Sequence, residues 1–178
     1  EEAMWFLAVL FPGTQLRILP YNRLVKDING LKPDAFMAEV GRRFTLTRNA
    51  APKPKLPRNI SLFINGEWHG LSWTDESKAD PVSALDVSVL QNRLLGPVLG
   101  IDDPRTSKRI DFVGGIRGTA ELENRVRSGE CAVAFSMYPT TVDQLMAIAD
   151  AGLIMPPKST WFEPKLKSGL LIHTIEPA

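Results

Sequence analysis

The pair Asn65-Gly66, placed between two short apolar segments, is the sequence feature that most constrains the fold of this chain. Asn-Gly supplies both positive-φ positions of a type I′ turn, whose twist matches that of two antiparallel strands. Residues 60–64 and 67–73 on either side are rich in β-branched and aromatic residues, so they predict the two arms of a hairpin. Antiparallel sheet is therefore the first structure that the chain predicts.

Helical and strand patterns alternate irregularly along the rest of the chain. Pro33 fits the first turn of a helix in which Phe36 and Val40 recur at helical spacing, and Asp80-Pro81 is typical of a capped helix start. On the same grounds we expect helices over residues 33–43, 80–95, 119–126 and 142–151, and further strands over residues 4–11, 16–19, 44–47, 110–113, 131–137 and 169–175. This order predicts an α+β fold with a mixed, mainly antiparallel sheet and three to four helices.

The apolar run at residues 4–11 is typical of a central, fully buried strand, because it is short and ends at Pro12-Gly13. It is too short to span a bilayer as a helix, and no basic segment precedes it, so neither a membrane span nor a signal peptide is expected. The chain has no initiator methionine and begins directly on this segment. We therefore expect residues 1–178 to be a single domain that forms the C-terminal region of a longer protein.

Composition narrows the classes of function. The chain is 44% hydrophobic and 23% charged, as in ordinary soluble globular proteins, which argues against disorder, collagen-like repeats and membrane residence. The 21 Lys and Arg residues against 20 Asp and Glu leave a net charge of +1, so no global field draws nucleic acid or an anionic membrane to the chain. The single cysteine, Cys131, fits a reducing, cytoplasmic setting. Any affinity for anions must come from local features.

Several other kinds of site find little support. His69, on the outward side of the predicted hairpin, and His173 have no carboxylate or cysteine at ligand spacing, so no metal site is expected. Cys131 lies in an apolar strand pattern, which does not favour a reactive thiolate. Residues 42–58 carry six basic residues and no acid, but they match no nucleic-acid motif, so a solvated linker is the stronger interpretation.

The glycine loop that follows the predicted strand 110–113 is the first candidate site. Gly114, Gly115 and Arg117 lie between a strand and a helix start, where backbone N–H groups and a guanidinium can hold phosphate or carboxylate. The segment matches neither the dinucleotide-binding pattern nor the phosphate-binding P-loop. A tight turn that simply requires glycine is the alternative, and the sequence favours it.

A proline-rich loop near the C-terminus is the second candidate. Lys158 is a point charge for an anionic ligand, and the hydroxyls of Ser159 and Thr160 are hydrogen-bond partners beside it. The alternative is a rigid surface loop that Trp161 and Phe162 anchor on the core. The sequence does not decide between the two.

Three polar residues at the end of an early strand form the third candidate. Tyr21, Asn22 and Arg23 follow Pro20 and offer a hydroxyl, an amide and a guanidinium. Asn22 is also a common turn former, and Tyr21 suits the edge of a core, so a structural role is the favoured interpretation for these residues.

Four separated motifs in this order resemble a known family. They are LPYNR at residues 19–23, LDV at 85–87, FVGG at 112–115 and KSTWF at 158–162. Together they identify the chain as similar to the 1015 family of domains of unknown function, which is conserved in bacteria and archaea. The resemblance implies a protein about twice as long, whose N-terminal half carries a Gly-His-His-Arg motif that this chain lacks.

The resemblance also implies a field of function. The Gly-His-His-Arg half is similar to the ParB-like fold, which includes nucleotide-dependent kinases of free serine, and family members are often encoded beside serine-biosynthesis genes. These associations imply a role in phosphotransfer or serine metabolism, with a nucleotide as the cofactor class. They concern residues that this chain lacks, so they assign no catalytic residue here, and the chain alone is expected to be inactive.

Two hypotheses follow. In the first, the chain contributes part of a site for a small anionic ligand, such as a phosphate, nucleotide or phosphoserine-like molecule, and its own N-terminal half completes the site. In the second, the chain is a scaffold for that half or a homodimerisation module, and its motifs preserve packing. The second predicts an open apolar surface beside residues 5–11 and no pocket between the glycine loop and Lys158, and it would be favoured if these two loops lay far apart.

Overall fold

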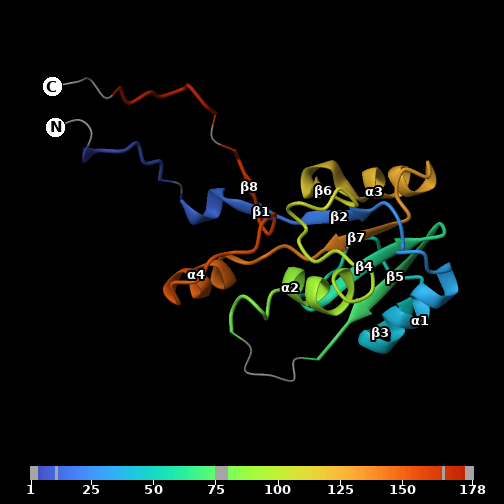
Figure 1. Ribbon diagram of the computed structural model, residues 1–178. Helices are drawn as coiled ribbons and strands as arrows, with labels where there is room; N and C mark the ends of the chain where they lie inside the picture. The colour runs from blue at the N-terminus through green and yellow to red at the C-terminus, as the bar shows by residue number, and fades with distance from the viewer. Residues whose placement is uncertain (1–3, 11, 75–79, 166, 175–178) are drawn as a thin grey trace. The chain divides into compact units, whose positions relative to one another are not determined.

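The computed structural model describes residues 4–10, 12–74, 80–165 and 167–174 (Figure 1). The chain divides into two compact units, which we treat separately. The sheet unit is Ile18–Trp161, and the terminal unit combines Glu1–Arg17 with Phe162–Ala178.

A six-stranded antiparallel sheet forms the centre of the sheet unit. Its strands lie in the order β3-β5-β4-β7-β2-β6, and every pairing within it is antiparallel. The strands are β2 (Tyr21–Val25), β3 (Thr45–Arg48), β4 (Asn59–Ile64), β5 (Glu67–Ser72), β6 (Ile110–Gly114) and β7 (Val133–Met137). The described helices are α1 (Pro33–Arg43), α2 (Asp86–Leu90), α3 (Gly118–Arg127) and α4 (Val142–Asp150), with short helical turns η2 (Gly13–Gln15), η3 (Gln91–Leu95) and η4 (Gly115–Arg117). The predicted α+β class with a mainly antiparallel sheet is confirmed.

Local signals set several element ends. The hairpin of β4 and β5 turns at Asn65 and Gly66, whose φ angles of 52° and 84° are those of the predicted turn. Pro33 opens α1 as expected. Thr141 caps α4 in a capping box, in which its hydroxyl accepts from the backbone of Gln144 and the Gln144 side chain accepts from Thr141 N–H. These elements form where the sequence predicts them.

The helix predicted over residues 80–95 begins later than its cap signal. The Asp80 carboxylate accepts from the backbone N–H groups of Val82 and Ser83, which closes a local turn and starts no helix. The α-helix runs only from Asp86 to Leu90, and a π-helical turn, η3, continues it to Leu95.

Helices cover both faces of the sheet, as Figure 1 shows for α3 on one side and α1 with α2 on the other. Two clusters of buried hydrophobic residues form the core, and residues that alternate along the strands contribute to one or the other. The larger cluster takes Val25, Leu62, Leu71 and Phe135 from the strands and Phe36, Leu90, Leu94 and Ile148 from the helices; the smaller takes Leu24, Phe63, Trp68 and Ala134 together with Leu122 of α3. His69 is buried, with 7% of its surface exposed, so its predicted outward position is wrong: β5 is covered on both faces.

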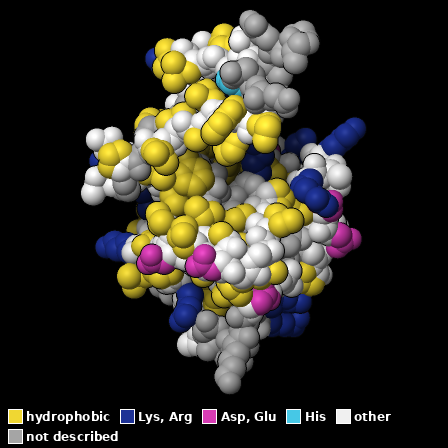
Figure 2. Space-filling view, turned by 90° about the vertical axis from the view of Figure 1, so that its left-hand side faces the viewer, with side chains coloured by type: hydrophobic (Ala, Val, Ile, Leu, Met, Phe, Trp, Pro, Cys, Tyr) yellow, Lys and Arg dark blue, Asp and Glu magenta, His cyan; other side chains and the backbone are white. Residues whose placement is uncertain are grey.

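The terminal unit corrects two strand predictions. Residues 4–10 form no strand, and Trp5, Phe6 and Leu10 are 71%, 86% and 94% exposed; Phe11 lies outside the described residues. The strand predicted at 169–175 is also wrong, since residues 169–174 are turn and irregular backbone and residue 175 is not described. Both predictions rested on apolar runs, but an apolar run forms a strand only where a neighbouring strand pairs with it. Figure 2 shows many hydrophobic side chains on the face it presents.

Two short strands lie where the chain passes from one unit to the other. β1 (Arg17–Leu19) pairs with β8 (Trp161–Glu163) in a two-stranded sheet. The pattern at residues 161–163 had not been interpreted as a strand. In the described part of the chain, no helix combines the length and the apolar character that a membrane crossing requires.

Candidate functional site

A cavity of about 460 Å³ lies within the sheet unit, a size typical of small-molecule sites. The strands β2 and β6 form one wall, α2 and η3 another, and two loops complete it. The residues that line it are Arg23, Val82, Ser83, Val87, Ser88, Gln91, Asn92, Leu95, Asp102, Asp103, Pro104, Arg105, Phe112, Pro156 and Pro157. Of the residues predicted for the site, Arg23 alone is among them.

Arg23 is a buried cation in this wall. Its side chain is 4% exposed, and its guanidinium lies 5.6 Å from the centre of the Phe112 ring. It donates to the backbone oxygens of Tyr21 and Lys158, the second at 3.2 Å, and has no ion pair with a carboxylate in the described residues. Burial lowers the pKa of Arg23 to about 10, so the group remains charged at neutral pH. A buried charge without a counterion is costly unless a ligand supplies one.

The glycine loop and the Lys158 loop meet around Trp161. The Lys158 ammonium lies 5.4 Å from the centre of the Tyr21 ring, and that ring contacts Trp161 edge to face at 5.2 Å. Tyr21 pairs with Gly114 across β2 and β6. Arg23, which donates to the Lys158 carbonyl, joins the same group. A wide separation of these loops, which would favour the scaffold hypothesis, is therefore not observed, but the lining of the cavity includes neither the glycine loop nor Lys158.

Gly114 and Gly115 are sites of close packing. A Cβ on Gly114 would lie 2.3 Å from the Trp161 ring, and a Cβ on Gly115 would lie 2.6 Å from Pro20. The Gly115 N–H already donates to the Pro20 carbonyl at 2.8 Å. Close packing therefore requires glycine at both positions, whether or not an anion binds there.

The remaining predicted residues have the following positions. Asn22 is buried, and its side-chain oxygen accepts from the Met137 N–H at 3.0 Å. Ser159 is buried; its hydroxyl donates to the Pro156 carbonyl, which fixes the loop. Thr160 is half-buried beside it, and the guanidinium of the exposed Arg117, the last residue of η4, lies 3.8 Å from the Glu121 carboxylate of α3. Tyr21, Asn22 and Arg23 open strand β2 and do not end one, as the sequence had suggested.

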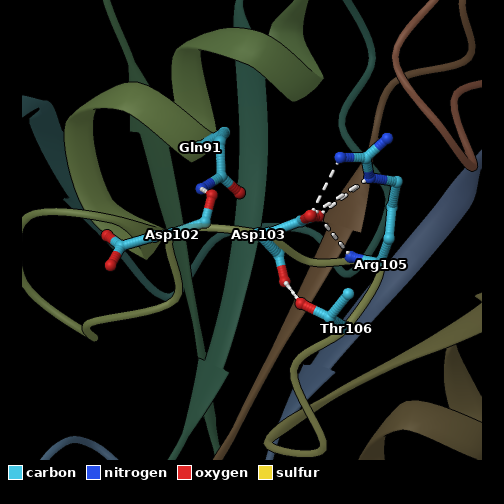
Figure 3. A network of polar contacts seen from close by, with 5 residues as sticks. All are labelled: Gln91, Asp102, Asp103, Arg105 and Thr106. Atoms are coloured by element: carbon cyan, nitrogen blue, oxygen red, sulfur yellow. Dashed lines mark hydrogen bonds and ion pairs between the residues drawn. The ribbon is translucent and has the colours of Figure 1, made fainter.

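Another part of the cavity lining belongs to a polar network (Figure 3). The Gln91 side-chain nitrogen donates to the backbone oxygens of Ile101 at 2.6 Å and Asp102 at 3.3 Å. The Asp103 carboxylate accepts from the guanidinium and the backbone of Arg105, which neutralises it. No role for residues 102–105 was predicted from the sequence. The pair of adjacent carboxylates, Asp102 and Asp103, is the one sequence signal in this segment.

Asp86 is a buried carboxylate beside the cavity-lining residues Val87 and Ser88. It is 8% exposed, and both its oxygens accept from the backbone N–H of Arg58 at 3.1 Å. Burial is the main cause that raises its pKa to about 6, and the Arg58 N–H opposes the shift only in part.

Replacement of Asp86 by asparagine is expected to change how stability depends on pH. Because the folded chain holds the Asp86 proton more tightly than the unfolded chain, wild type loses stability relative to Asp86→Asn as the pH rises from about 4 to about 6. The relative loss reaches up to about 3 kcal/mol and is constant above that range. Urea unfolding of both proteins at pH 4 and pH 8 measures it.

Asp27→Asn is the matched control with the opposite sign. The Arg109 guanidinium holds the pKa of the Asp27 carboxyl below its usual value, so wild type should gain stability relative to this variant as the pH rises through the acidic range. Equal pH profiles for Asp86→Asn and wild type would contradict the assigned burial of Asp86.

Metal and thiol chemistry gain no support from the described residues. No group of three or more His, Cys, Asp or Glu side chains among them could hold a metal ion. Burial raises the pKa of the Cys131 thiol, which opposes thiolate formation.

Comparison with known proteins finds a family match for one part of the chain. Residues 1–88 match the family described as "Protein of unknown function (DUF1015)", which supports membership of the chain in that family. The matched residues include the first two motifs and Arg23, whereas FVGG and KSTWF lie beyond them. No curated protein matches the chain.

Solved structures share the fold at low sequence identity. A free serine kinase variant in complex with AMP superposes with a TM-score of 0.51 at 11% identity, over 84% of this chain and 55% of that one. A conserved hypothetical protein from Pyrococcus furiosus gives 0.50 at 12% identity, over 83% and 56%. The free serine kinase in complex with AMP also gives 0.50, at 12% identity. The chain spans little more than half the length of these proteins, and the likeness concerns the fold alone.

Proposed function

We propose that this chain binds a small phosphate-bearing ligand in the cavity beside Arg23, and that a further part of the protein, corresponding to the N-terminal half of its relatives, completes the site. The observation that carries the proposal is the buried Arg23 guanidinium, which lines the cavity and has no carboxylate partner among the described residues. A phosphate group supplies the missing counterion and accepts two parallel N–H bonds.

The donor capacity of Arg23 supports the proposal. A guanidinium carries five N–H donors. Two backbone carbonyls, those of Tyr21 and Lys158, accept from it, and they use one terminal nitrogen each. Donors therefore remain for a ligand, and the two carbonyl contacts hold the guanidinium in a fixed orientation, so a ligand does not have to order it.

The Lys158 loop contributes a second positive group near this wall. Pro156 and Pro157 line the cavity, and the Lys158 ammonium, held over the Tyr21 ring, follows them directly. An ammonium at the rim of an anion site raises the local concentration of anions without a direct contact.

The structural relatives suggest which phosphate compound to test. The free serine kinase with this fold is a complex with AMP, and a role in serine metabolism or phosphotransfer is the finer function that we propose for the whole protein. Under this proposal the chain alone binds its ligand weakly and transfers no phosphate, because the remaining residues of the site lie outside it.

Calorimetric titration with AMP, phosphoserine and inorganic phosphate tests the proposal. We expect saturable 1:1 binding of at least one of them in the millimolar range or tighter, and about threefold weaker binding by Lys158→Gln, since an exposed charge contributes little. Arg117→Gln, which alters an arginine outside the cavity lining, should bind as wild type does. No binding of any of the three anions would overturn the proposal.

The exposed apolar side chains on and after α4 favour a second candidate, a homodimerisation surface. Val142, Met146 and Ile154 are 50%, 52% and 87% exposed. Contiguous exposed apolar surface commonly marks an interface, and Val142 and Met146 are one helical turn apart on α4. Sedimentation equilibrium should then show a dimer that Met146→Glu dissociates. A monomer at all concentrations would remove this candidate.

A further inference from the structure

One residue in the lining of the cavity beside Arg23 carries an acceptor that no described residue uses. The Gln91 side-chain oxygen is buried and has no hydrogen-bond partner in the described residues. A buried polar atom without a partner is uncommon in native proteins and calls for an explanation. Gln91 lines the cavity, so a bound ligand is the nearest source of a donor.

The orientation of the Gln91 amide is fixed. Its nitrogen donates to the carbonyls of Ile101 and Asp102, and a flipped amide would set its oxygen against both. Figure 3 shows the amide nitrogen on the Asp102 side and the oxygen directed away from it. Gln91 thus presents an acceptor only, which can bind N–H or O–H donors.

The backbone at Gln91 is unusual as well. Gln91 opens the π-helical turn η3, whose Gly96 N–H donates to the Gln91 carbonyl at 3.0 Å. π-helical turns are rare and often lie at functional sites, because they shift side chains out of the regular helical positions. Asn92 and Leu95 of the same turn also line the cavity.

A carboxylate lines the same cavity as this acceptor. Asp102 lines the cavity, and its side-chain oxygens have no hydrogen bond or ion pair within the described residues, whereas the neighbouring Asp103 is neutralised by Arg105. Figure 3 shows the Asp102 carboxylate directed away from the other residues drawn. The lining thus combines one buried cation, Arg23, with an uncompensated carboxylate and a free acceptor.

From this distribution we infer that the ligand carries an amino group in addition to its anionic group, with the anion at Arg23 and the amino N–H at the Gln91 oxygen. This inference rests on the proposed function, since it concerns the same cavity. Two chemical sources supply such an amino group: the ammonium of a phosphorylated amino acid and the exocyclic amine of an adenine nucleotide. Asp102 favours the first, because a carboxylate attracts a charged ammonium more than a neutral amine.

Two matched ligand pairs test the inference on the wild-type chain. AMP is compared with purine riboside 5′-monophosphate, which has a hydrogen in place of the amine, and O-phosphoserine with phosphorylated 3-hydroxypropanoate, which has a hydrogen in place of the ammonium. We expect the amino member of at least one pair to bind about tenfold more tightly, since the unpaired acceptor must otherwise stay unsatisfied. Equal affinities within both pairs would overturn the inference, and if Arg23 were still required, the proposed function would stand. No binding at all would overturn both.

Variants then identify the residue that binds the amino group of the ligand. Gln91→Leu should abolish the preference within the pair; a folded Gln91→Leu protein that keeps the full preference would overturn the inference. If this variant does not fold, the ligand pairs on the wild type decide alone. Asp102→Asn should reduce a preference for phosphoserine about fivefold but leave a preference for AMP unchanged, which distinguishes the two sources. Asp150→Asn, an exposed carboxylate on α4 outside the cavity lining, is the matched control and should change neither.

Discussion

Replacement of Gly114 by alanine is expected to lower the free energy of unfolding by about 3 kcal/mol. An added Cβ would lie 2.3 Å and 2.4 Å from two carbon atoms of the Trp161 ring, far inside van der Waals contact. The backbone of Gly114 cannot easily retreat, because it pairs with Tyr21 between β6 and β2. The ring is held as well, since it packs edge to face against Tyr21. Strand and ring must therefore separate.

Gly41→Ala is the matched control for this prediction. Gly41 lies inside α1, and a Cβ there meets no atom within 4 Å. Alanine in a helix interior is about 0.5–1 kcal/mol more favourable than glycine, so this variant should be slightly more stable than wild type. Urea unfolding measures both changes. A Gly114→Ala protein as stable as wild type would contradict the close packing of Gly114 and Trp161.

The same contact explains why the glycine loop was only partly understood from sequence. Its strand, turn and helix were predictable from local patterns, and so was the alternative that the turn itself requires glycine. The contact with Trp161 was not, because it joins residues far apart in the chain. The hydrogen bond of the Gly115 N–H was not predictable from local patterns either. The sequence predicted that this group is available for an anion, but it donates to the Pro20 carbonyl.

Elements with local signals were predicted well. The Asn65-Gly66 turn, Pro33 at the start of α1 and Thr141 at the start of α4 are each set by residues within one turn of the chain. The apolar run at residues 4–10 carried no such signal, and its hydrophobicity was taken for burial although its side chains are exposed. Burial depends on what else covers a segment, which local patterns do not encode.

The residues of the cavity were likewise only partly predictable from the sequence. Arg23 was named from sequence as one of three polar residues, but its burial follows from its place in the central part of the sheet, between β6 and β7. Gln91 was missed because no residue pattern marks a π-helical turn. Asp102 was not identified from the sequence either, because only the fold brings it into the lining of the same cavity as Arg23.

Replacement of Arg23 by methionine is expected to weaken the binding of AMP at least about thirtyfold. Truncation of a buried, hydrogen-bonded charge at a binding site commonly costs 30-fold or more, because the anion of the ligand is left unpaired in a desolvated site. Methionine keeps an unbranched apolar side chain next to Phe112, so packing in the wall is largely preserved.

The stability of Arg23→Met separates a binding role from a structural one. The variant loses two hydrogen bonds to backbone carbonyls but also removes an isolated buried charge, and these terms oppose each other. We expect a free energy of unfolding within about 1 kcal/mol of wild type. A purely structural arginine would instead show a large loss of stability.

The affinity of AMP for wild type, Arg23→Met and Arg48→Met, measured by calorimetric titration at one ionic strength, tests the central claim most directly. Arg48 is an exposed arginine on β3 outside the cavity lining and serves as the charge-matched control. Our account predicts that Arg48→Met binds AMP as wild type does, whereas a folded Arg23→Met binds it at least about thirtyfold more weakly. Equal affinity of Arg23→Met and wild type would contradict the assignment of Arg23 as the anion-binding residue.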